Sequence, residues 1–142
     1  MGGPSRRTSQ FFQEACDNCL TWISCLAWLN AHSARLEAEF PPITSYQRQI
    51  IDNAQAIGLI HGSGPMPWTE IAAWLERSEI NYTLGEQELL RDISATYISV
   101  YRASEKEEVD PPYMTEEGAL KRAIMKAKAR KSALMAAANN KK

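Results

Sequence analysis

The sequence contains few of the side chains from which enzymes build active sites. Among 142 residues there are only two histidines, His32 and His61, and three cysteines. Acid–base and nucleophilic catalysis need such groups beside a positioned nucleophile or carboxylate, and neither histidine has one close in the sequence. The glycine-rich stretch at 58–64 also lacks the Gly-Lys-Ser/Thr of a phosphate-binding loop. We therefore expect no enzymatic activity and no cofactor.

The three cysteines and His32 have the spacing C-x2-C-x5-C-x6-H, which invites comparison with a zinc site. All four residues fall in a strongly helical stretch. On a helix, Cys25 and His32 would lie roughly 9 and 20 Å beyond Cys19 along the axis. One tetrahedral ion cannot bind ligands so far apart. We predict no metal site and expect reduced, buried thiols.

Long hydrophobic runs are also missing. The most apolar stretch, CLTWISCLAWL at 19–29, has eleven residues, whereas a membrane-spanning helix needs about 20. Arg6 and Arg7 precede this run, as in an export signal, but Glu14 and Asp17 separate them from it. The sequence thus predicts a buried helical segment, no membrane contact and a cytoplasmic location.

The net charge of −1 conceals a strong asymmetry along the chain. Residues 1–118 contain 8 basic and 17 acidic residues, whereas residues 119–142 contain 8 basic residues and no acidic one. A basic tail on an acidic body indicates a charged partner for the tail. A solubilising role is the alternative. The candidate polyanion-binding residues, spread around the tail helix, are Lys121, Arg122, Lys126, Lys128, Arg130 and Lys131.

No run of alternating β-branched residues is present, and helix signals recur along the chain. Capping boxes at Thr44/Gln47 and Thr83/Glu86 predict two helix starts, Pro67 predicts a third, and Gly58 predicts an end. The fold class is predicted to be all-α, a small bundle of about four helices followed by a basic C-terminal helix. The predicted helices cover 9–40, 44–58, 67–77, 83–104 and 115–138.

This pattern predicts a leader at 1–10, a helical domain at 11–110 and a basic helical tail at 111–142. The first helix is apolar over more than half of its circumference in its middle. We expect it to be a central strut or a self-association surface. The second helix is expected to turn inward the residues Tyr46, Ile50, Ile51, Ala54 and Ile57.

The segment 68–80 has the apolar spacing of a helix-turn-helix, with Ile71 and Leu75 followed by Ile80. Its recognition helix would carry Glu86 and Glu88, whose negative charge is unfavourable beside phosphates. DNA readout by this segment is therefore disfavoured.

Two motifs carry a resemblance to a known family. They are GSGPMPWTEIAAWL at 62–75 and E-x2-LL-x2-IS-x2-Y at 86–97. Together they resemble small proteins encoded in the tail-morphogenesis region of tailed bacteriophages, which are regarded as tail assembly chaperone-like. The similar stretch covers 51–101, about a third of the chain.

The resemblance implies a non-enzymatic role in tail or virion assembly. A protein of this kind binds the long, apolar, helix-rich tape-measure protein and keeps it soluble until the tail tube forms around it. The implied location is the host cytoplasm or the virion. Large aromatic and aliphatic side chains provide most contact energy at such interfaces. The predicted partner-binding residues are Trp22, Trp28, Leu29, Trp68 and Trp74.

Two other functions fit the same sequence. A nucleic-acid-associated phage protein, such as a packaging or regulatory factor, would use 119–142 on the phosphate backbone. A structural virion component would use its long first helix in a ring or bundle, by self-association.

Overall fold

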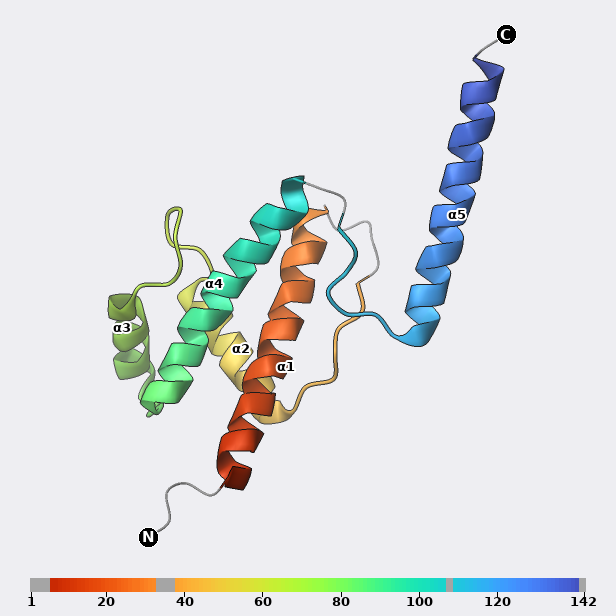
Figure 1. The fold of residues 1–142 in the computed structure, drawn as a ribbon. Coiled ribbons are helices and arrows are strands. Elements are labelled where there is room, and N and C mark those ends of the chain that lie inside the picture. The colour runs from red at the N-terminus through yellow and green to blue at the C-terminus, as the bar shows by residue number, and fades with distance from the viewer. Residues whose placement is uncertain (1–5, 33–37, 107–108, 141–142) are drawn as a thin grey trace. The chain divides into compact units, whose positions relative to one another are not determined.

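The computed structural model describes residues 6–32, 38–106 and 109–140. It is 74% helical, and these residues form five helices and no strand, so the predicted all-α class is confirmed. The chain divides into two compact units, 1–112 and 113–142. The first unit holds α1 (Arg6–Ala31), α2 (Ser45–Ile57), α3 (Trp68–Ser78) and α4 (Leu84–Lys106), and the second holds α5 (Glu116–Asn139) (Figure 1).

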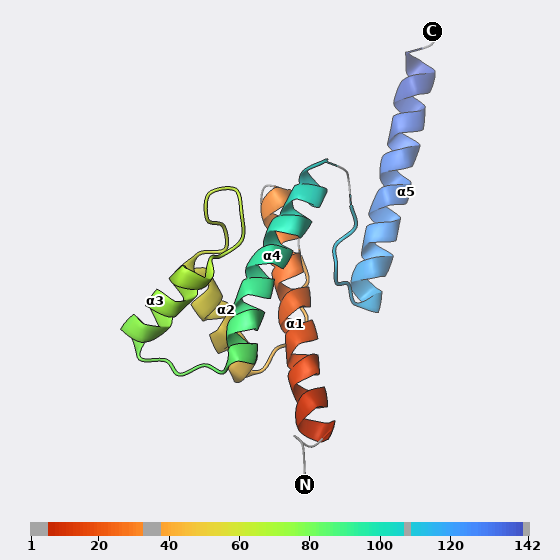
Figure 2. The ribbon, with the colours of Figure 1, turned by 60° about the vertical axis from the view of Figure 1, so that its left-hand side comes forward.

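The longest helices of the first unit, α1 and α4, lie side by side and run parallel (Figures 1 and 2). Near their amino ends, Phe12 packs against Gly85, where an added Cβ would lie 3.4 Å from the Phe12 ring. Toward their carboxyl ends, the Asn30 side-chain amide donates to the Tyr97 hydroxyl at 2.9 Å. Two parallel helices of one chain need a connection that runs back along their length. Here α2 and α3 form this connection.

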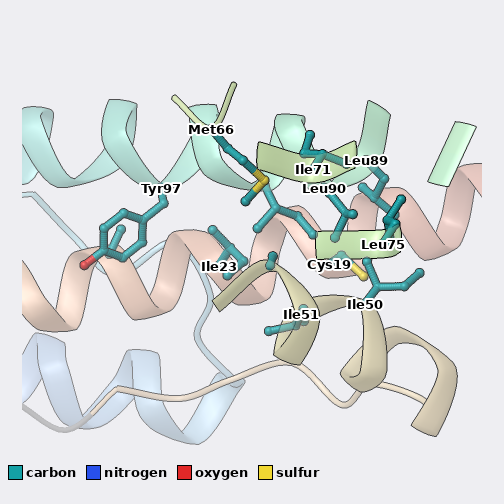
Figure 3. Close-up of a cluster of buried hydrophobic side chains, with 13 residues drawn as sticks. Cys19, Ile23, Ile50, Ile51, Met66, Ile71, Leu75, Leu89, Leu90 and Tyr97 are labelled. Carbon is teal, nitrogen blue, oxygen red and sulfur yellow. The ribbon is translucent and has the colours of Figure 1, made fainter. Parts of the chain in front are cut away.

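The core of the first unit forms where α1 to α4 meet, with α2 and α3 on one side of the α1–α4 pair (Figure 3). Each helix supplies an apolar stripe, and the buried stripes pack against one another. The stripe of α4 is buried or packs against the core, and its residues are Leu89, Leu90, Ile93, Tyr97, Val100 and Tyr101. The central side chains are Cys19, Ile23, Ile50, Ile51, Met66, Ile71, Leu75, Leu89, Leu90, Ile93 and Tyr97.

Local capping explains where most helices begin. Thr44 accepts from the Gln47 amide at 3.2 Å, and Gln47 Oε1 accepts from the Thr44 amide at 2.8 Å. Thr83 and Glu86 form the equivalent pair at 3.2 and 2.9 Å. Both predicted capping boxes are therefore confirmed. Gly58, with φ 110°, ends α2 in a conformation that L-residues rarely adopt.

The loop between α2 and α3 is tied to α4 by one buried serine. The Ser94 hydroxyl accepts from the Met66 amide at 2.8 Å and donates to the Leu59 carbonyl at 2.7 Å. His61 and Gly64 exchange two backbone hydrogen bonds at the tip of the loop. This arrangement places Pro67 as the N-cap of α3 and so positions Trp68 at the first residue of that helix.

The bounds of the first helix differ from the prediction. It starts at Arg6, inside the predicted leader, where no glycine or proline interrupts the chain between Pro4 and Pro41; residues 1–5 lie outside the described part. It ends at Ala31 rather than near residue 40, and residues 33–37 are not described. Phe40 packs on Trp22 with ring centroids 4.8 Å apart. In an unbroken helix these residues would lie about 27 Å apart, so the chain must turn back.

The inward face of the second helix also needs one correction. Tyr46 was expected inside but is 38% exposed, whereas Gln47 is 5% exposed. The capping box holds the Gln47 side chain against the helix start, and the Gln47 carbonyl accepts from the Cys19 thiol at 3.8 Å. The capping requirement, rather than hydrophobicity, decides which of these neighbours faces inward.

The second unit is a single helix. Thr115 is the N-cap of α5 and its hydroxyl accepts from the Gly118 amide at 3.1 Å. No residue of α5 is buried. Across the described ranges of the chain, no helix has the length and apolar character needed to cross a membrane.

Candidate partner-binding surfaces

Trp28 is not available to a partner, so its predicted role is wrong. Its side chain is 1% exposed and its indole Nε1 donates to the Val109 carbonyl at 2.7 Å. The His32 ring lies 4.7 Å from the indole ring. The segment after α4 therefore folds back over this part of α1 and buries the tryptophan within its own unit.

Trp22 and Leu29 are partly buried and lie on a face of α1 that the chain itself covers in part. The Trp22 ring packs on Phe40, and the Arg48 guanidinium carbon lies 5.1 Å from the centroid of the indole ring. A cation this close to an aromatic face is attracted by its quadrupole. Trp22 thus already has an aromatic and a cationic neighbour inside the first unit.

Trp68 is the predicted partner residue that the structure leaves most accessible. It is 44% exposed at the start of α3. The Arg91 guanidinium carbon, from α4, lies 5.7 Å from the centroid of its ring. The Arg91 Nε is buried and has no hydrogen-bond partner. We call these two residues the Trp68–Arg91 surface. Arg91 was not predicted, because only the fold brings positions 68 and 91 together.

Trp74 occupies a different flank of α3. Six residues separate it from Trp68, so the two side chains point about 120° apart around the helix axis. Trp74 is partly buried and packs against the core, and its indole Nε1 is buried without a hydrogen-bond partner. Trp74 is therefore mainly a core residue with one unsatisfied donor.

A polar contact joins α2 to the start of α4. The exposed Tyr46 hydroxyl donates to Glu86 Oε2 at 2.7 Å. Burial alone would raise the pKa of Glu86, but the hydrogen bonds from Tyr46 and Thr83 outweigh it and hold this pKa below its usual value. Burial and the neighbouring carboxylate raise the pKa of Tyr46. Glu86 is thus an ionised acceptor that fixes the helix start, with the features of a structural group rather than an acid catalyst.

The thiols have the properties of structural cysteines. Cys19 and Cys25 are buried and Cys16 is partly buried, and none of the three forms a disulfide bond. Burial raises the pKa of Cys19 to about 12, with a smaller effect from Cys16. Burial and the charges of Asp17 and Asp92 raise the pKa of Cys16. Thiols protonated at neutral pH are poor nucleophiles and poor metal ligands. Among the described residues, no cluster of ligands suits a metal ion.

The six predicted polyanion-binding residues all lie on α5, and none of them is buried. Lys121 forms an exposed ion pair with Glu117, one turn earlier, at 3.3 Å. The apolar side chains of the same helix are exposed as well: Leu134 is 72% exposed. The helix therefore presents both positive charge and apolar surface. Its exposed large apolar residues are Leu120, Ile124, Met125, Leu134 and Met135.

Comparison with known proteins adds no relative: no protein-family model, curated protein or solved structure matches the chain. Several apolar residues of the resemblance at 51–101 lie in the core, where Ile71, Leu90 and Tyr97 are buried. Trp68 is the large aromatic residue of that stretch that remains exposed.

Proposed function

We propose that this protein is a non-enzymatic assembly protein of a tailed bacteriophage that binds an apolar helical client, such as the tape-measure protein, in the host cytoplasm or the assembling virion. The proposal rests on the resemblance of 51–101 and on one structural observation. Trp68, inside the resembling stretch, is 44% exposed, whereas Met66, Ile71 and Leu75 of the same stretch are buried in the core.

The Trp68–Arg91 surface has the composition of a protein-binding hot spot. Tryptophan and arginine are the residues that most often dominate binding energy at interfaces. The indole ring offers apolar area to a client helix, and the Arg91 guanidinium lies beside it. The attraction between a guanidinium and an aromatic ring strengthens when a docking partner excludes water from the pair.

The test is co-purification of the full chain with a co-expressed tape-measure protein, comparing the wild type with Trp68→Ala. Loss of a hot-spot tryptophan weakens binding by about thirtyfold or more. The matched control is Leu134→Ala, which removes an exposed apolar side chain from the other unit. Equal recovery of the client by the wild type and Trp68→Ala, or no recovery by the wild type, would refute this function.

A further inference from the structure

The exposed apolar residues of α5 gather on one side of that helix. At 3.6 residues per turn, Leu120, Ile124, Leu134 and Met135 fall within an arc of about 100°. All four are exposed. On the same reckoning, Lys128 and Arg130 border this arc on opposite sides, and Lys131 lies within it. We call this side of α5 the basic stripe.

The first unit carries a surface of opposite charge on its parallel helix pair. Phe12 of α1 packs against Gly85 of α4, and the two helices run parallel. Asp17, five residues after Phe12, therefore lies level with the turn of α4 between Glu88 and Asp92. Asp17 and Asp92 both act electrostatically on the thiol of Cys16. Glu88 precedes Asp92 by one turn of α4. All three acids are exposed. The partly buried Cys16 and Leu20 lie beside Asp17 and add apolar surface. We call Asp17, Glu88 and Asp92 the acidic face.

We propose that the basic stripe of one copy packs on the acidic face of a second copy of this chain. Charge complementarity identifies a second copy as the partner of the basic stripe. Residues 1–118 include 17 acidic and 8 basic residues, whereas every charged residue of 119–142 is basic. Two α5 helices repel each other, whereas α5 and the acidic face attract. The apolar residues on both sides are removed from water in the same contact.

This contact is head-to-tail, because each copy contributes a different surface to each of its neighbours. Such a contact closes at two copies if each α5 packs on the acidic face of the other copy, and otherwise it produces a larger ring or an open chain. The inference does not depend on the proposed client, because neither surface includes Trp68 or Arg91. A nucleic acid would satisfy the lysines and arginines but would leave the apolar arc in water, which is why a protein surface is favoured.

The test compares the mass of the full-length wild type in solution with that of two neutralised variants, over a range of concentration and ionic strength. The stripe variant replaces Lys128→Gln, Arg130→Gln and Lys131→Gln. The face variant replaces Asp17→Asn, Glu88→Gln and Asp92→Asn. The control variant replaces Glu70→Gln, Glu76→Gln and Glu79→Gln, and so removes the same amount of charge from α3 and its C-cap as the face variant removes from the acidic face.

We expect the wild type and the control to exceed the 15.9 kDa of one chain at low ionic strength and to dissociate as salt is added. The stripe and face variants should each associate about tenfold more weakly. An equal mixture of the two keeps one intact pair of surfaces, the stripe of the face variant and the face of the stripe variant. The mixture should therefore form a complex of two chains that does not grow further.

Three results would overturn the inference. One is a wild type that keeps the mass of a single chain under all conditions. This includes the case in which the single chain binds double-stranded DNA through Lys128, Arg130 and Lys131, as a gel mobility shift would show. The second is association that survives in both neutralised variants. The third is a mixture that fails to form the two-chain complex, which would result if α5 packed on its own chain. None of these results bears on client binding by Trp68.

Discussion

The two units of this chain form helices for different physical reasons. In the first unit, α1 to α4 each bury part of one face, and Ile23, Ile71 and Ile93 are completely inaccessible. In the second unit, α5 buries nothing. Its sequence is dominated by alanine, lysine, leucine and methionine, which have high helix propensity, and Thr115 caps its start. Tertiary packing thus stabilises the first unit, and local preference stabilises the second.

This difference has a thermodynamic consequence. A packed unit of this size unfolds cooperatively, because its helices share one core. An isolated helix gains stability only through propagation and capping, and it melts gradually. Equivalent truncations, one at a buried position and one at an exposed position, should therefore have different effects on unfolding in the two units.

The largest contrast should come from equivalent truncations in the two units. Ile93→Ala removes a fully buried side chain at the centre of the core, and we expect it to lower the free energy of unfolding by about 2 to 5 kcal/mol. Met125→Ala, an exposed position of α5 outside the basic stripe, should leave this free energy unchanged. Urea denaturation followed by tryptophan fluorescence measures both, since all four tryptophans lie in the first unit. Similar losses in the two variants would mean that α5 is part of the cooperative core.

A smaller effect is expected where the core depends on one hydroxyl group. Ser94→Ala deletes the acceptor of the Met66 amide and the donor to the Leu59 carbonyl. Both partners are left unpaired near the core, at an expected cost of about 1 to 3 kcal/mol. Denaturation gives the size of the loss, and faster hydrogen exchange of the Met66 amide would localise it. Ser99→Ala, on the exposed side of the same helix, is the control.

The smallest effects should come from substitutions at the helix caps. A cap substitution should change the stability of the first unit but only the helix content of the second. Thr44→Ala removes the N-cap of α2 and should destabilise the first unit by about 1 kcal/mol. Thr115→Ala removes the N-cap of α5. It should reduce the helical circular dichroism signal without shifting the denaturation midpoint of tryptophan fluorescence. A shift of that midpoint would contradict the independence of α5.

Features set by neighbouring residues were predictable from the sequence. Both capping boxes and the helix end at Gly58 depend on a few adjacent residues and occur as predicted. Pro67, predicted as the first residue of the third helix, is instead the N-cap directly before it. The end of α1 was not predictable, because the contact between Trp22 and Phe40 decides it. That contact exists only after the chain has turned back.

The candidate site shows the same limit more sharply. Trp28 lies inside the apolar run at 19–29 and Trp68 is the first residue of α3, but the sequence does not show which segment of the fold covers either side chain. The difference arises because the segment at Val109 covers Trp28, whereas no segment of the described chain covers Trp68 to the same degree. Arg91 joins Trp68 only through the packing of α3 on α4.

The parallel pairing of α1 and α4 bears on how the chain matures. Contacts such as that between Asn30 and Tyr97 close a loop of 67 residues, and folding slows as contacts become more distant in sequence. During synthesis α1 emerges from the ribosome long before α4 exists. Its apolar run at 19–29 therefore stays in contact with solvent or other proteins until α4 has been synthesised. An assembly factor built this way would itself depend on protection while it is being made.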